Sequence, residues 1–388
     1  MTILTLLLGL ACDAQPDATP ASEQPAAAVI APVSPKGRSE TFDATLATLD
    51  AALAGMEERS AARPTQWLPQ GQLAEGLLQR ARLTGSYDDY ARANQAVDAA
   101  FAIAPEGAGP FLTRASLNYS LHRLDRVEPD LARAEGAVLV DDGTRARILG
   151  MRAGLQLQQG RAADAAALYR QALDLDRPPS LLSALAIAQG RQGDYTAAET
   201  TLLEAAAAYH GASVEPLAWI ALHRGIFDLD RDNLDQALVH YDEALAIMPG
   251  WWLAQEHVAE IDVLQGRGDQ AVAMYQDIVD RTGLPEFMDA IAGVRQDQGD
   301  DESAQAWRAR ARQAYERQLA LFPEAAAGHA LQHYLDAGDA PETAVQLAEA
   351  NAEIRPNAQA LGLLAQAYAS AGRDQDAAQA RARAAGVD

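Results

Sequence analysis

A small residue returns at a nearly fixed interval along most of this chain, and this repeat constrains the fold more than any other feature. The steps are about 34 residues, with occasional insertions of about five. Such a period indicates stacked helix pairs, in which each pair buries its apolar face only against its neighbours. Two series run in parallel at a constant offset, namely Ala153, Ala186, Gly225, Ala259, Ala292 and Ala365, and then Ala165, Ala198, Ala237, Ala271, Ala304 and Ala377.

Each unit carries the residue types that two packed antiparallel helices need. The helices approach closely only where side chains are small, which accounts for the Ala or Gly at each crossing. A glycine such as Gly160 or Gly266 can take the left-handed conformation that ends the first helix. Ahead of the repeats, one segment has the apolar spacing of an amphipathic helix that caps or starts the array. Its apolar positions are Phe42, Leu46, Leu49, Leu53 and Met56.

One unit shows the complete pattern of a known repeat. Ala237 is followed four residues later by Tyr241 and then by Pro249, with Gly225 in the preceding helix. In this respect the chain resembles the tetratricopeptide repeat family, and the resemblance covers about residues 70–388. It implies an all-α, right-handed superhelical solenoid of tandem antiparallel helix pairs. About nine pairs are expected, and the second helix of the seventh is expected to be overlong, from Asp301 to Phe322.

The net charge of the chain indicates which classes of molecule it can bind. Its 388 residues include 31 Lys and Arg against 54 Asp and Glu, for a formal net charge of −23 at pH 7. This balance argues against nucleic acid, because phosphates are bound mainly by Lys and Arg. It also disfavours electrostatic docking on anionic lipid. Basic or neutral proteins are the partners that it favours.

The N-terminal residues resemble a bacterial lipoprotein signal. Ile3 to Ala11 is a short apolar run, and Cys12, the only cysteine, follows Gly9-Leu10-Ala11 as in a lipobox. The resemblance implies that Cys12 is lipidated and that the protein sits at the cell envelope, facing the periplasm or the exterior and held to the membrane only by a lipid anchor. The alternatives are an ordinary cleaved signal or a chance apolar start.

These patterns divide the chain into four parts. Residues 1–12 are expected to be the lipoprotein-type signal segment. Residues 13–40, rich in Pro and Ala without apolar periodicity, are expected to form a disordered tether. An N-terminal helix and divergent helical repeats occupy 41–145, and regular tandem repeats occupy 146–388.

Solenoids of the tetratricopeptide type bind peptides in a concave groove lined by first helices, and the repeat pattern predicts which residues face that groove here. The fourth and fifth units offer an apolar floor of Ser183, Ile187, Trp219, Leu222 and Ile226. The sixth and seventh offer an acidic wall of Glu256, Glu260, Glu286 and Asp289. An apolar segment with Arg or Lys would complement this groove. The alternative is that the apolar residues pack between repeats and the acids are solvated.

Other candidate sites have simpler explanations. Of the adjacent Trp251 and Trp252, one is expected in the core and the other as an exposed anchor. His329 and His333 have the i, i+4 spacing of a metal pair, but packing is favoured. The evenly spaced His223, His240 and His257 follow from the repeat itself, and Asp228–Asn233 lacks the glycine and glutamate of a calcium loop. No catalytic, cofactor-binding or metal-binding residues are therefore predicted.

The sequence favours a non-catalytic protein–protein interaction scaffold or adaptor, a solenoid tethered to a bacterial envelope membrane. One alternative is a structural component of an envelope assembly. Another is an enzyme or metal-binding protein that uses the repeats as a frame. The identity of the partner and the oligomeric state do not follow from the sequence.

Overall fold

The computed structural model describes residues 38–137 and 139–387, and in this part of the chain all regular secondary structure is helical. Cys12, the signal segment and most of the predicted tether lie outside the described residues. The helices are α1 (Phe42–Ala62), α2 (Trp67–Thr84), α3 (Tyr87–Ile103), α4 (Phe111–Ser120), the short 3-10 helix η1 (Leu124–Arg126), α5 (Val127–Glu135), α6 (Asp142–Gln158), α7 (Ala162–Leu175), α8 (Pro179–Arg191), α9 (Tyr195–Ala208), α10 (Glu215–Leu229), α11 (Leu234–Ile247), α12 (Trp252–Leu264), α13 (Gly268–Thr282), α14 (Pro285–Asp297), α15 (Asp301–Leu321), α16 (Pro323–Ala337), α17 (Pro341–Ile354), α18 (Ala358–Ser370) and α19 (Asp374–Ala384).

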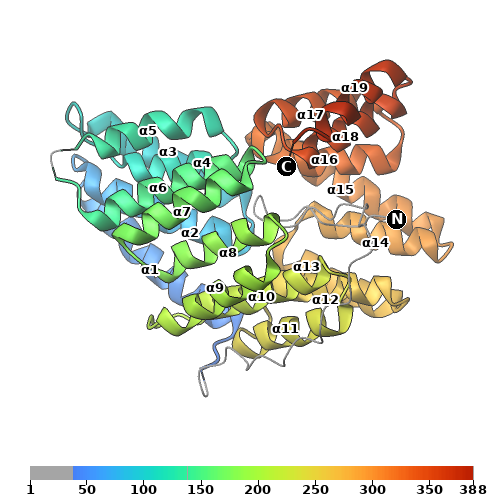
Figure 1. Ribbon diagram of the computed structural model, residues 1–388, viewed down its shortest axis with the longest axis horizontal. Helices are drawn as coiled ribbons and strands as arrows, with labels where there is room; N and C mark the ends of the chain where they lie inside the picture. Colours follow the sequence, from blue (N-terminus) through green and yellow to red (C-terminus); the bar gives the residue numbers. More distant parts are fainter. Residues whose placement is uncertain (1–37, 138, 388) are drawn as a thin grey trace.

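Within the described residues, the helices from α2 onward form nine successive packed pairs, which confirms the predicted all-α solenoid (Figure 1). The pairs run from α2 with α3 to α18 with α19, and each pair also packs on the next one. The long second helix of the seventh pair is α15, as predicted. The predicted boundary between the divergent and the regular repeats, after residue 145, falls inside α6.

The repeated small residues lie at the helix crossings, where they are almost completely buried. The crossing in the fifth pair leaves no room for a side chain, because a Cβ on Gly225 would lie 2.3 Å from Cε1 of Tyr241. In most of the repeats a glycine with positive φ follows the first helix, as predicted. In the fifth pair Asp232 takes that conformation instead, with φ of 59°.

The divergent N-terminal part differs in detail from its sequence pattern. α1 continues through Gly55 to Ala62, and of its apolar residues only Phe42 and Leu53 are fully buried. In the second pair α4 and α5 have only 10 and 9 residues, and a turn at Leu121 and His122 followed by η1 separates them. None of the described helices combines the length and apolar character that crossing a bilayer requires.

The superhelix curves until its first pairs meet its later ones. The indole Nε1 of Trp252 on α12 donates to the carbonyl oxygen of Leu83 on α2 at 3.0 Å. Arg123, after α4, pairs with Glu324 on α16 at 3.3 Å, and the ring of Tyr87 on α3 packs on Phe322. Figure 1 shows α4 beside α16 in keeping with these contacts. Residues at the end of α2 and the start of α3 thus contact residues of α12 and of the junction between α15 and α16.

Candidate functional site

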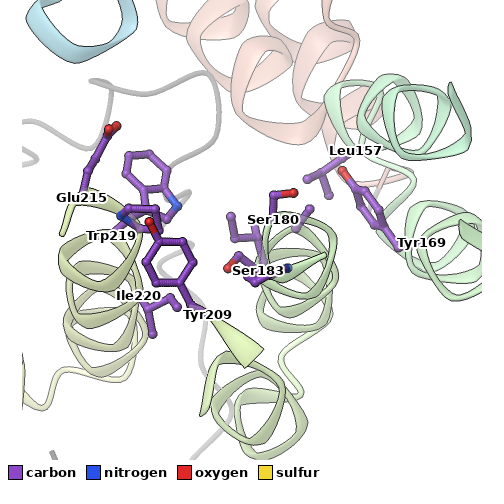
Figure 2. A pocket seen from close by; sticks show the side chains of 12 residues that line it. Leu157, Tyr169, Ser180, Ser183, Tyr209, Glu215, Trp219 and Ile220 are labelled. Carbon is purple, nitrogen blue, oxygen red and sulfur yellow. The ribbon is translucent and has the colours of Figure 1, made fainter. Parts of the chain in front are cut away.

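A pocket of about 430 Å³ opens between α8 and α10, at the fourth and fifth pairs. In Figure 2, Glu215, Trp219 and Ile220 of α10 face Ser180 and Ser183 of α8 across this space. The residues that line it are Leu157, Tyr169, Pro179, Ser180, Ser183, Ala184, Ile187, Tyr209, Glu215, Pro216, Trp219 and Ile220.

Helical periodicity places these side chains on the two walls. On α8 the lining residues recur from Ser180 through Ser183 to Ile187, which is one stripe of a helix. On α10 the stripe includes Glu215 and Trp219, four residues apart. Each helix starts with a proline in its first turn, where the missing N–H costs nothing.

The loop between α9 and α10 closes one end of the pocket. It is the insertion that lengthens the fifth repeat, and it carries Tyr209. The hydroxyl of Tyr209 donates to the carbonyl oxygen of Ser213 at 2.9 Å, which fixes the ring within the loop. Arg38 donates to the carbonyl oxygens of Gly211 and Ala212, so the first described residue of the chain holds this loop from outside.

Trp219 is the largest side chain of the pocket, and its neighbours hold it in place. It packs on His223 with ring centroids 4.5 Å apart and on Trp251 at 6.2 Å. Its indole is half-buried, so one part is fixed and another part faces the pocket. Such an anchored aromatic ring can contact a ligand with little further loss of side-chain entropy.

The polar groups of the pocket are few. They are the hydroxyls of Ser180, Ser183, Tyr169 and Tyr209 and the carboxyl of Glu215. Burial raises the pKa of the Glu215 carboxyl above its ordinary value and also raises the pKa of Tyr169. The pocket is therefore mainly apolar and aromatic, with one carboxyl at its α10 wall.

Three residues of the predicted apolar floor do line this pocket, and two do not. Ser183, Ile187 and Trp219 are among the lining residues. Leu222 and Ile226 are in the core of the solenoid, with exposed fractions of 0% and 2%. They lie on the faces of α10 that pack against neighbouring helices, so a docked segment cannot reach them in this structure.

The acidic residues predicted to form one wall of the groove are instead largely buried. Glu256, Glu260 and Glu286 are buried and Asp289 is half-buried. Burial and the nearby charge of Glu286 raise the pKa of Tyr87 on α3, so Glu286 lies close to the first pair. Burial raises the pKa of Glu256 to about 8 and that of Glu286 to about 7. These side chains do not form a solvated surface for a basic partner.

Histidines accompany the buried acids. His329 Nδ1 lies 3.5 Å from Glu286, and His333 Nδ1 lies 2.9 Å from Asp289. The two histidines thus pair with different carboxylates, in keeping with packing rather than a shared ion. His257 lies between Glu256 and Glu260, each 3.4 Å away.

The remaining candidates also have structural roles. Trp251 and Trp252 are both buried, so the expectation of one exposed anchor is wrong. Trp251 packs on Trp219 of α10, whereas Trp252 packs on Phe287 of α14. His223 packs against Trp219 and Phe227, whereas His240 lies beside Asp228 and Glu243. The carboxylate of Asp228 forms an ion pair with Arg231 and accepts a hydrogen bond from Asn233, so these contacts satisfy it without a calcium ion.

No protein-family model matches the chain, and no curated protein matches it either. Among solved structures, the apo form of the quorum sensor NprR from B. thuringiensis is similar over 80% of this chain and 96% of its own, with 12% identity and a TM-score of 0.48. A tetratricopeptide repeat protein from Parabacteroides merdae is similar over 66% of this chain and 99% of its own, with 16% identity and a TM-score of 0.41.

Proposed function

We propose that this protein is a non-catalytic protein-interaction scaffold, and that a segment of its partner binds in the pocket between α8 and α10. The observation that carries the proposal is Trp219, a large aromatic ring fixed on one side and facing a mainly apolar pocket on the other. Clefts of this kind between helices are frequent ligand sites, and buried tryptophans dominate binding energies.

The chemistry of the pocket selects an apolar segment with a basic residue beside it. Tyr169, Tyr209 and Trp219 offer rings to apolar or proline-containing side chains. Glu215 is the acid among the lining residues, and a cation beside it would favour its ionised form. The net charge of −23 adds long-range attraction for a basic chain.

We also propose that the N-terminus anchors the protein to a membrane. The apolar run from Ile3 to Ala11 before the lone Cys12 supports lipidation of that cysteine at a bacterial envelope membrane. The Pro-rich residues that follow would then act as the tether, so that the solenoid presents its pocket near the membrane surface. Mass spectrometry of the N-terminal peptide from native membranes tests this, because a Cys12→Ser variant would lose both the lipid mass and the membrane fraction.

The pocket is tested by selecting peptides from a random library on the immobilised full-length protein. We expect the selected peptides to combine apolar and basic residues, and to lose affinity for a Trp219→Asp variant. Val239→Asp is the matched control, because Val239 lies on α11 with 56% of its surface exposed, away from the pocket. Equal affinity for a folded Trp219→Asp variant, or a library that yields no binder, would contradict the proposal.

Leu222→Asp is not a useful test of binding. The side chain of Leu222 is completely buried, so an aspartate there places a carboxylate in the core. Loss of binding in that variant would report damage to the fold.

A further inference from the structure

One turn of α12 carries three buried side chains with the chemistry of metal ligands. Glu256, His257 and Glu260 have exposed fractions of 1%, 6% and 8%. Glu256 and Glu260 are four residues apart, so they project from the same face of the helix, and His257 lies between them. Within residues 38–137 and 139–387 this is the one group of three or more such side chains with convergent ligand atoms.

The ligand atoms are nearly close enough to share an ion. One nitrogen of His257 and one oxygen of each glutamate all lie within 4.8 Å of one another. A tetrahedral Zn²⁺ with ligand distances near 2.1 Å would place its ligand atoms about 3.4 Å apart. His257 Nε2 is already 3.4 Å from Glu256 Oε2, and the other ring nitrogen, Nδ1, is 3.4 Å from Glu260 Oε2. Because one ion binds only one nitrogen of the ring, one glutamate has the required spacing already, and the other must rotate toward the same nitrogen.

An unpartnered polar side chain independently points to a missing ligand. Neither carboxyl oxygen of Glu256 has a hydrogen-bond partner, although the residue is almost completely buried. The contact of Glu256 with His257 is therefore close without being aligned as a hydrogen bond. Leaving a buried carboxyl group unsatisfied costs free energy that a bound cation would recover.

A hydroxyl group close to the cluster also lacks a hydrogen-bond partner. The hydroxyl of Tyr275 on α13 is buried and has no hydrogen-bond partner. Burial and the charges of Glu256 and Glu260 together raise the pKa of this hydroxyl, which places it near both carboxylates. An ion between the glutamates would lower the negative potential at this hydroxyl and could bind it, directly or through water.

The ring of His257 is held in place between the two glutamates. It stacks on Tyr241 with centroids 5.0 Å apart and an angle of 10° between the planes. Nε2 lies on the side of Glu256 and Nδ1 on the side of Glu260. A neutral imidazole has a lone pair on one ring nitrogen, so either tautomer presents a ligand atom toward one of the two carboxylates.

We propose that Glu256, His257 and Glu260 bind one divalent first-row transition-metal ion of the Zn²⁺ class inside the solenoid. The imidazole selects such an ion over Mg²⁺ or Ca²⁺, which prefer oxygen ligands alone. The three residues lie on α12 in the sixth pair and are not among those that line the pocket between α8 and α10, so the proposal does not depend on the proposed binding function. The ion would neutralise the carboxylates of Glu256 and Glu260 and hold both side chains in place inside the solenoid.

The test uses the full-length protein after treatment with a chelator, dialysed against Zn²⁺ with excess Mg²⁺ to occupy surface carboxylates. We expect about one equivalent of Zn²⁺ to remain bound, and Co²⁺ to give the visible absorption bands of a tetrahedral or five-coordinate site. His257→Gln and Glu260→Gln variants should bind at least about tenfold more weakly. Asp262→Asn is the matched control, because Asp262 is a buried acid on the same helix that pairs with Arg267 at 2.8 Å.

Retention of one equivalent by Asp262→Asn together with its loss from both ligand variants supports the site. Equal retention by all variants would place the metal on the acidic surface and overturn the proposal. The Co²⁺ spectrum of the wild-type protein decides the matter even if a ligand variant fails to fold. A wild-type protein that binds no stoichiometric Zn²⁺ and shows no Co²⁺ bands would leave only a buried Glu–His–Glu ion pair.

Discussion

The indole of Trp252 on α12 donates a hydrogen bond to the carbonyl oxygen of Leu83 on α2, and so joins the sixth helix pair to the first. The two residues are 169 positions apart in the chain. Both lie in the core cluster that also contains Phe42 and Leu284. Closure of the superhelix thus rests on specific contacts between its two halves.

A Trp252→Phe variant tests this closure, because it keeps most of the ring and removes the donor. We expect the free energy of unfolding to fall by about 1 kcal/mol, since the carbonyl of Leu83 is left unpaired in a buried place. Urea unfolding gives the energy, and small-angle X-ray scattering shows whether the radius of gyration increases. Trp307→Phe, at a partly buried position on α15, should change neither quantity appreciably.

Gly225→Ala probes the helix crossing of the fifth pair. The added methyl group would lie 2.3 Å from the ring of Tyr241, so we expect a loss of about 1–3 kcal/mol in the free energy of unfolding. Gly362→Ala is the control, because Gly362 lies within α18 with open space around its Cβ position. That change should stabilise by about 0.4–1 kcal/mol. A neutral Gly225→Ala would show that the crossing is looser than described.

The buried Glu286 predicts a dependence of stability on pH. Burial raises its pKa from 4.5 to about 7, while the pKa of the adjacent His329 is lowered by burial to about 4. Between about pH 4.5 and 7 the folded state keeps the proton of Glu286 and the unfolded state releases it. The contribution of this group to the free energy of unfolding is therefore largest at the acidic end of this window and falls as the pH rises.

Replacing Glu286 with Gln removes this titration. The stability of Glu286→Gln relative to the wild type should increase by about 3 kcal/mol between pH 4.5 and 8. Urea unfolding of both proteins at several pH values measures the difference. A difference that does not change with pH would mean that Glu286 has an ordinary pKa and is solvated in the native protein.

Much of the solenoid follows from local sequence pattern. The small residues at crossings such as Ala237 and Ala271, and the capping glycines such as Gly266, act within one helix pair, so their spacing predicts where helices begin, cross and end. The long α15 was predictable for the same reason. The interruption of the second pair by η1 has no comparable repeat signal.

The candidate site was only partly predictable, because it depends on long-range curvature. Ser183, Ile187 and Trp219 share helix faces that the repeat pattern identifies, and they do line the pocket. The burial of Glu256 and Glu286 could not be predicted from one repeat, because contacts such as that of Trp252 with Leu83 join helix pairs that are far apart in the chain. Tyr209 lies in the loop between α9 and α10, outside the repeated positions, so the repeat pattern does not predict that it lines the pocket.

The charge of the partner segment can be tested at the rim of the pocket. Ser180 is exposed there, so substitutions should leave the fold intact. We expect Ser180→Arg to weaken the binding of selected basic peptides several-fold and Ser180→Glu to preserve or strengthen it, with differences that shrink at high salt. Titration calorimetry at two salt concentrations measures both. Tighter binding by Ser180→Arg would indicate an acidic partner.

Site-specific photo-crosslinking of a selected peptide to the full-length protein tests binding in the pocket most directly. A photoreactive amino acid is placed at Ser180, on the rim of the pocket, or at Val239, on the exposed face of α11. Binding between α8 and α10 predicts a crosslink from position 180, competed by unlabelled peptide, and none from position 239. Crosslinking from position 239 without any from position 180 would contradict binding between α8 and α10.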